Sequence, residues 1–136
     1  MMEEVTRYLA RQNGALDFIN IRLVSIVPDD RVVTPRCRSA DRMGIGSISL
    51  MRLCDTVRCL TLAVDAPHKP GVRIMNAVGA QANVAGTVPE LLRAWYSQDA
   101  DQIDFAHYER PGHARDAVYD ISYIRSELGF APEMEF

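Results

Sequence analysis

The sequence feature that most constrains the fold is an almost continuous apolar run from Phe18 to Val27, bounded by Gly14 and Pro28. Three polar residues interrupt the run: Asn20, Arg22 and Ser25. Such a run is typical of a strand that is covered on both faces, as the strands of parallel sheets are. The run therefore predicts an α/β fold, with an α+β arrangement as the alternative.

The rest of the chain alternates between helical and extended patterns. Apolar residues at helical spacing predict four helices, at residues 3–12, 53–64, 88–95 and 121–128. Looser alternation predicts two further short strands, at residues 47–53 and 72–78. Residues 28–46 show little periodicity and are expected to form a long loop, and residues 99–104 a surface turn. The 136 residues contain no repeat and no linker, so residues 1–136 are expected to form a single domain.

Two of these helices carry clear signals at their ends. Thr87 and Glu90 have the spacing of a capping box, with a proline in the first turn that follows. Asp120 is expected to cap the last helix, and Gly129 to end it. Trp95 has helical apolar spacing and is predicted to lie in the core.

Composition places the chain among ordinary globular proteins. Hydrophobic residues make up 48% and charged residues 24%, close to the averages for soluble domains. Fifteen basic and eighteen acidic residues give a net charge of −3, so no nucleic-acid partner is expected. No apolar stretch approaches the ~20 residues that cross a bilayer, and no apolar leader opens the sequence. We therefore expect no membrane partner, a cytoplasmic location and reduced cysteines at Cys37, Cys54 and Cys59.

Some polar residues are expected to have structural roles. Arg22 interrupts the apolar run, where an unpaired charge would be costly, so a carboxylate, a carbonyl or solvent must contact it. A structural ion pair is expected for Arg22, with contact to a ligand as the alternative. Asp55 is expected to cap the helix that follows it or to pair with a nearby arginine.

Three histidines fall in loop-like sequence and are expected to be solvated: His68, His107 and His113. Asp116 lies close enough to His113 in sequence for an acid/base pair. No Ser or Cys is spaced to act as its nucleophile, however, and no cysteine has metal-ligand spacing. The residues therefore predict neither a catalytic set nor a metal site.

Three segments carry motifs in a characteristic order. They are INIRLVSIVPDDR (Ile19 to Arg31), LCDTVRCLTLAVDAPHKPGVRIMNAVG (Leu53 to Gly79) and GHARDAVYDISYIRSELGFAP (Gly112 to Pro132). They resemble the motifs LRxxNVYGP, V.DvA.A..lal..p..G..yNvg and GDxRxxxaDiskaxxeLGwxP of the NAD-dependent epimerase/dehydratases, the extended short-chain dehydrogenase/reductases. Asp55 stands at the Asp of "DvA", and Asn76, to which we assign a structural role, at the Asn of "yNvG".

This resemblance implies a partial Rossmann-type fold, the C-terminal substrate-binding part of such an enzyme. In the family, the arginine of GDxR binds the diphosphate of a nucleotide-sugar, and here that position is Arg115, with His113 in place of the Asp. The loop after the first motif closes on substrate in the family. The four arginines of this loop are therefore expected to contact substrate or to be merely solvated: Arg31, Arg36, Arg38 and Arg42.

Two functional motifs of the family do not occur in this sequence. It contains neither the Gly-rich turn that binds the cofactor nor the Tyr-x-x-x-Lys pair that carries the redox chemistry. We therefore expect no cofactor-binding or catalytic residues and no NAD binding by this chain, because pyrophosphate recognition in this class needs that turn.

The resulting hypothesis is a substrate-binding remnant or fragment of a nucleotide-sugar epimerase/dehydratase without redox activity of its own. One alternative is a small self-associating interaction module. Another is one subunit of a split enzyme that a separate nucleotide-binding chain completes. In the family, the sheet around the strand that resembles Phe18 to Val24 is built mainly by residues that this sequence does not contain. Apolar surface between Val5 and Val27 would then face water in a monomer, so a homodimer or higher oligomer through this region is expected.

Overall fold

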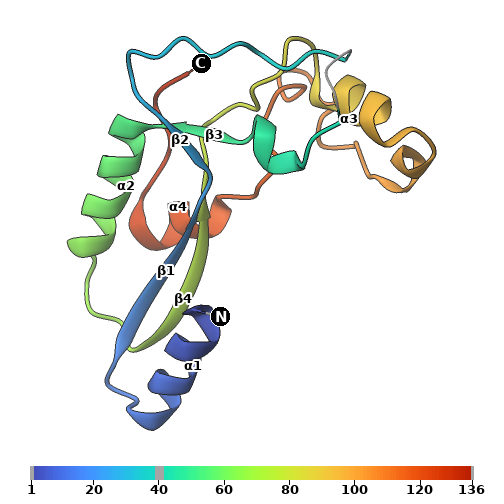
Figure 1. The fold of residues 1–136 in the computed structure, drawn as a ribbon. Helices are drawn as coiled ribbons and strands as arrows, with labels where there is room; N and C mark the ends of the chain where they lie inside the picture. Colours follow the sequence, from blue (N-terminus) through green and yellow to red (C-terminus); the bar gives the residue numbers. More distant parts are fainter. Residues whose placement is uncertain (1, 39–41, 136) are drawn as a thin grey trace.

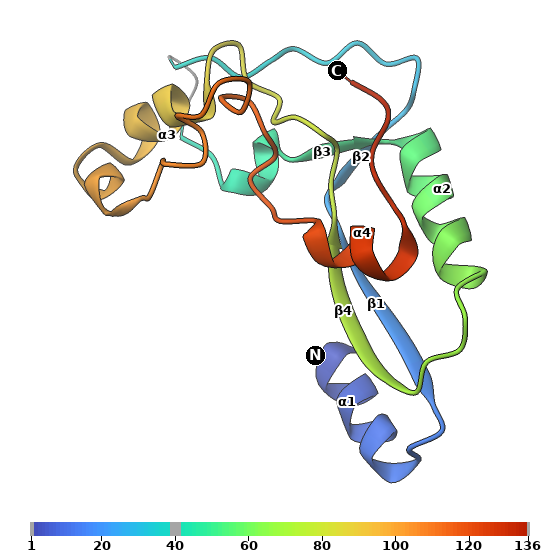
Figure 2. The same cartoon turned by 180° about the vertical axis from the view of Figure 1, so that it is seen from behind.

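The computed structural model describes residues 2–38 and 42–135. These form a mixed α/β structure with four α-helices and four short strands, arranged in two small parallel sheets (Figures 1 and 2). In chain order the elements are α1 (Met2–Gln12), β1 (Asp17–Leu23), β2 (Ser25–Val27), the 3₁₀ turn η1 (Ile45–Ile48), β3 (Leu50–Arg52), α2 (Leu53–Val64), β4 (Gly71–Ala77), α3 (Val88–Tyr96), the 3₁₀ turn η2 (Ser97–Gln102) and α4 (Ser122–Leu128). The predicted α/β class is confirmed at this level.

The apolar run that predicts one strand forms two. β1 pairs with β4, in a register that runs from Asp17 opposite Gly71 to Leu23 opposite Ala77. β2 pairs instead with β3. The chain changes partner at Val24, which lies between the two strands. The prediction of a single continuous strand is therefore wrong, because the partner strands and not the apolar pattern decide where pairing stops.

The expectation that this run is covered on both faces is also wrong for β1. Its residues are half-buried or exposed, and Leu23 is 39% exposed. Helix α1 packs against β1 and β4 but has no buried residue of its own among those described. Its apolar residues Val5, Tyr8 and Leu9 point to solvent, while Thr6 accepts a hydrogen bond from Asn20 of β1. The helix thus covers the strands with its polar side.

The buried side chains form two clusters. One lies between β4, α2 and α4 and includes Met51, Cys59, Met75, Ile124 and Phe130. The other surrounds α3, at the far end of the molecule in Figure 1. It consists of Ile48, Ala82, Val84, Val88, Leu91, Leu92, Trp95 and Phe105. Trp95 is 5% exposed, which confirms its prediction as a core residue.

The helix ends follow the local sequence signals closely. In α3, Thr87 accepts a hydrogen bond from the Glu90 N–H at 3.2 Å, and Glu90 accepts one from the Thr87 N–H at 3.0 Å. This confirms the capping box. At the start of α4 the N-cap position is Ile121 rather than the expected Asp120; Asp120 lies one residue earlier and accepts from the Ser122 N–H at 2.8 Å. Gly129 ends that helix with a left-handed φ of 68°, a conformation that favours glycine.

Helix α2 begins differently from the expectation. Asp29, in the loop after β2, accepts a hydrogen bond from the Cys54 N–H at 3.1 Å and so caps the helix from outside. Asp55 lies within the first turn and pairs with Arg58, whose Nη2 donates to its Oδ1 at 2.7 Å. The capping role of Asp55 is therefore wrong, whereas its pairing with a nearby arginine is confirmed.

The long loop expected at residues 28–46 extends to residue 44, because η1 begins at Ile45. Its described residues, 28–38 and 42–44, contain no helix or strand, and residues 39–41 lie outside the described residues. Across residues 2–38 and 42–135, no helix combines the length and apolar character needed to span a membrane.

Candidate functional site

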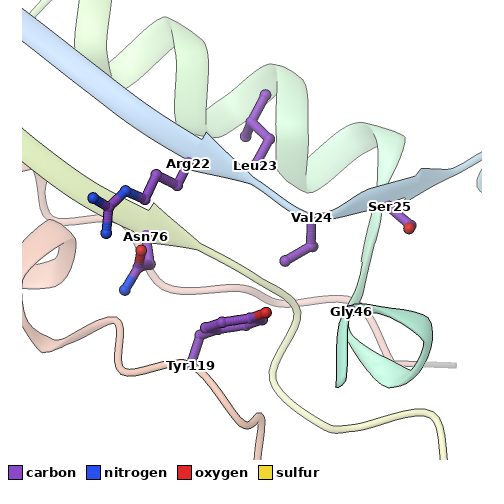
Figure 3. A pocket seen from close by; sticks show the side chains of 7 residues that line it. All are labelled: Arg22, Leu23, Val24, Ser25, Gly46, Asn76 and Tyr119. Atoms are coloured by element: carbon purple, nitrogen blue, oxygen red, sulfur yellow. The ribbon is translucent and has the colours of Figure 1, made fainter. Parts of the chain in front are cut away.

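A cavity of about 550 Å³ lies at the carboxyl end of the β1–β4 pair. Its lining residues come from the end of β1, the step between β1 and β2, η1, β4 and the segment before α4 (Figure 3): Arg22, Leu23, Val24, Ser25, Gly46, Asn76 and Tyr119. In open α/β sheets, ligands bind outside the carboxyl ends of the strands. The volume also falls in the range of small-molecule sites.

The parallel pairing explains why these side chains meet. Arg22 and Asn76 are register partners, so both reach the same end and the same face of the sheet (Figure 3). The chain turns at Val24, between β1 and β2, and Val24 lines the cavity there (Figure 3). Tyr119 lies across this space from Val24 in Figure 3. The Asn76 amide donates to the Asp120 carbonyl oxygen at 3.3 Å, which ties this wall to the start of α4.

Arg22 carries the positive charge of this cavity. Its Nε and Nη2 donate to the two carboxylate oxygens of Glu3, at 2.6 and 2.8 Å. The hydrogen bond from Arg22 lowers the pKa of Glu3. The predicted partner for Arg22 is therefore found, but its side chain is 59% exposed rather than enclosed in an apolar strand. Arg22 and Asn76, which were predicted to be structural, thus also line the cavity.

The predicted phosphate contact, Arg115, lies elsewhere. It is exposed, and it is not among the residues that line the cavity. Its backbone carbonyl accepts a hydrogen bond from the Ala82 N–H at 2.8 Å. Arg36 pairs with Val84 of the same extended segment. Arg115 and the arginine loop are therefore both attached to residues 82–85, through different backbone groups.

The four loop arginines do not converge on one point. Arg31 and Arg36 line a second hollow of about 400 Å³, which shares Ser25 with the first cavity. The Arg42 guanidinium lies over the Tyr96 ring, 4.5 Å from its centre. Arg38 faces the start of α3. There the pKa of Glu90 is lowered chiefly by its hydrogen bonds with Thr87, and Arg38 adds to this.

The histidines form a cluster that the sequence does not reveal in full. His107 Nε2 and His113 Nδ1 each lie 2.8 Å from Oδ2 of Asp116. The pairing of His113 with Asp116 is readable from their spacing, but His107 joins them only because the chain folds back in the turns between residues 105 and 116. His68 lies apart, exposed, with its ring contacting the Ala15 carbonyl. Two of the three histidines are thus organised on one carboxylate.

The electrostatics of this cluster centre on Asp116. Burial raises the pKa of Asp116, but the hydrogen bonds from His113 and His107 more than offset this, so the pKa lies below its ordinary value. The Arg110 guanidinium also contacts Nδ1 of His107. The cluster opens onto a cavity of about 580 Å³ that is separate from the one at the strand ends, although Tyr119 lines both.

Comparison with known proteins finds no family model, no curated protein and no solved structure that matches this chain.

Proposed function

We propose that this chain is the substrate-binding part of a nucleotide-sugar epimerase/dehydratase and that it has no redox activity of its own. One observation supports this proposal above the others. The three segments that resemble the family lie far apart in sequence, yet each contributes to the cavity at the strand ends. The first supplies Arg22 to Ser25, the second Asn76 and the third Tyr119.

The cavity offers the chemistry that such a substrate needs. The guanidinium of Arg22 matches the geometry and charge of a phosphate group. The Ser25 hydroxyl and the Asn76 amide provide hydrogen-bonding groups for sugar hydroxyls. The ring of Tyr119 supplies a flat apolar surface with a polar tip. Arg22 is paired with Glu3 at the surface, so a phosphate that binds Arg22 would compete with one carboxylate.

An extended ligand would reach the predicted loop arginines as well. Ser25 lines both the cavity at the strand ends and the hollow of Arg31 and Arg36. A nucleotide-sugar has two phosphates between its sugar and its nucleoside, so it is long enough to occupy adjoining hollows. In this arrangement Arg22 binds one phosphate, and Arg31 or Arg36 contacts the other end of the ligand.

Nucleotide-sugar binding is expected to depend on Arg22. In calorimetric titrations with UDP-glucose, dTDP-glucose and GDP-mannose, at least one should bind saturably. Arg22→Ala should weaken that binding at least tenfold, since a charge-assisted hydrogen bond contributes about 1.5–3 kcal/mol. Arg7→Ala is the matched control, because Arg7 is also exposed and paired with a glutamate of α1, at 2.9 Å, but does not line the cavity. It should leave binding unchanged.

Parallel titrations with NAD⁺ and NADP⁺ test the other half of the proposal. Neither cofactor should bind, because the sequence contains no Gly-rich phosphate-binding turn. Saturable NAD⁺ binding would contradict the absence of a cofactor site. The absence of any nucleotide-sugar binding, or equal weakening by both arginine variants, would contradict the assignment of the cavity.

A second candidate function rests on a different surface. Apolar side chains of β1 and α2 line an open hollow of about 500 Å³: Ile19, Ile21, Leu23, Leu60, Ala63 and Val64. Among the described residues, β1 pairs only with β4, so its other edge is open. A surface of this kind favours a self-associating module, in which a second copy covers the region from Val5 to Val27. A separate nucleotide-binding chain would use the same surface in a split enzyme.

Self-association should be measurable in the isolated chain. Light scattering at micromolar concentration should give a dimer or larger species rather than a particle of 15.2 kDa. Leu23→Glu should shift the equilibrium toward the monomer, because Leu23 is 39% exposed and borders the open edge of β1. Val32→Glu is the control, since Val32 is 92% exposed and lies outside the region. A monomer in all three proteins would contradict self-association without affecting the ligand proposal.

A further inference from the structure

The cluster of His107, His113 and Asp116 brings three metal-binding groups together in the segment between α3 and α4, which is orange in Figure 1. One ligand atom from each residue lies within 4.8 Å of the other two. Nε2 of His107 and Nδ1 of His113 each lie 2.8 Å from Oδ2 of Asp116. The three side chains are between 34% and 47% exposed, so a dissolved ion can reach them.

We propose that these three residues form a binding site for a divalent transition-metal ion, with Zn²⁺ as the best fit. Zinc accepts imidazole nitrogen and carboxylate oxygen at about 2.0–2.2 Å. Four ligands in a tetrahedron around such an ion lie roughly 3.4 Å apart. Each nitrogen would therefore move some tenths of an ångström away from Oδ2 of Asp116, and the ligand atoms of the two histidines, which lie within 4.8 Å of each other, would come to about the same separation. Two nitrogen ligands and one oxygen favour zinc over Mg²⁺ or Ca²⁺, which prefer oxygen alone.

Three protein ligands leave one position of the tetrahedron for water or for an external group. The cluster borders the cavity of about 580 Å³, whose lining also includes Tyr119, Asp120 and Arg125. The free position therefore has room for an anionic group such as a carboxylate or a phosphate. The site is independent of the proposed nucleotide-sugar cavity, because none of its three ligands lines that cavity.

The contact between Arg110 and His107 determines which ring nitrogen of His107 carries the hydrogen. The Arg110 guanidinium contacts Nδ1 of His107, and a guanidinium only donates hydrogen bonds. Nδ1 must then accept, and the imidazole hydrogen lies on Nε2, facing Asp116. A metal ion on Nε2 reverses this, because the hydrogen must then move to Nδ1. Metal binding therefore requires the Arg110 guanidinium to move away from Nδ1 of His107, and the arginine also opposes the ion by its charge.

The position of Arg110 allows a variant that strengthens binding. Arg110→Gln removes the positive charge, and its amide oxygen can accept a hydrogen bond from the Nδ1–H of metal-bound His107. Hydrogen bonds to the residues that bind a metal change its affinity by roughly 10–100-fold. If the two histidines served only to hydrogen-bond Asp116, Arg110→Gln would not tighten metal binding.

The test is a titration of the metal-free chain with Zn²⁺ alone. Calorimetry measures the binding, and the ¹⁵N chemical shifts of the imidazole rings report which nitrogens bind the ion. One ion should bind per chain with a Kd tighter than roughly 50 µM, and the shifts should report coordination through Nε2 of His107. His107→Ala and His113→Ala should each weaken binding at least tenfold. Arg110→Gln should tighten it by a similar factor.

Two controls separate this site from other zinc-binding groups. His68→Gln changes the histidine outside the cluster. Cys37→Ser with Cys54→Ser removes the two exposed thiols. Both controls should leave the affinity unchanged. Binding weaker than about 50 µM, loss of binding in either control, or no loss in the two cluster variants would overturn the proposal.

Discussion

Replacing Asp55 with alanine should destabilise the fold by about 3–5 kcal/mol, a large share of the stability of a domain of this size. The carboxylate is only 2% exposed and accepts hydrogen bonds from three donor groups. Arg58 donates to it at 2.7 Å, and the N–H groups of Glu133 and Met134 donate at 3.0–3.2 Å. Asp55 therefore ties α2 to the last residues of the chain. Its loss leaves several buried donors and a half-buried guanidinium without this acceptor.

Urea denaturation checks this prediction. Asp65→Ala is the control, since Asp65 is exposed at the other end of α2, and it should change the free energy of unfolding by less than about 0.5 kcal/mol. Asp55→Asn should fall between the two, because an amide keeps one acceptor oxygen and adds a donor that faces other donors. An Asp55→Ala chain as stable as the Asp65→Ala chain would show that the C-terminal segment does not depend on this carboxylate.

Local signals were readable from the sequence, whereas contacts between distant residues were not. The capping box of α3 and the glycine end of α4 involve neighbouring residues, so their spacing predicts them directly. The division of the apolar run into β1 and β2 depends on which strands lie beside it. β4 is more than 40 residues further along the chain, and no pattern within the run records its register.

In the candidate site, too, the sequence indicates individual residues but not the contacts between distant ones. The sequence singles out Arg22 and Asn76, but their shared position follows only from the parallel register of β1 and β4. The expectation for Arg115 rests on the resemblance to a motif, and Arg115 does not line that cavity. His107 joins His113 and Asp116 through a chain reversal without periodicity, so spacing alone could not connect the three.

Arg73 is the most buried arginine among the described residues that form ion pairs, and the sequence predicts no role for it. Arg73 alternates with Val72 and Ile74 in β4, a pattern that places it on the same face as Met75. That face is the buried one, and the Arg73 side chain is only 6% exposed. Its partner Asp17 lies at the start of β1, where the two strands run side by side. The Asp17–Arg73 pair therefore depends on the register of β1 and β4, which the sequence alone does not reveal.

Removing Asp17 alone should cost about 3–5 kcal/mol of stability, while removing both members of the pair should cost clearly less. Nη2 of Arg73 donates to both oxygens of Asp17, at 2.8 and 2.7 Å. The next carboxylate, Glu127, lies 3.7 Å from Arg73 Nη1 and also binds Lys69. Asp17→Ala therefore leaves a buried charge poorly compensated. Asp17→Ala with Arg73→Met removes that charge and the buried Nε of Arg73, which has no partner.

A double-mutant cycle measured in urea should give a coupling energy of about 1–3 kcal/mol between Asp17 and Arg73. Arg7→Ala with Glu4→Ala is the control cycle, since this exposed pair should couple by less than about 1 kcal/mol. Equal coupling in the two cycles would mean that burial adds nothing to the Asp17–Arg73 pair.

The same pair should set part of the acid sensitivity of the fold. The hydrogen bond from Arg73, followed by that from the Lys69 N–H, lowers the pKa of Asp17 below its ordinary value of 3.8. A carboxylate with a lowered pKa in the folded state stabilises that state at pH values above its unfolded pKa. This contribution is lost as the pH falls below about 4 and through the folded pKa. The native chain should therefore lose more stability between pH 7 and pH 3 than the Asp17→Ala, Arg73→Met chain, and equal losses would contradict the assignment.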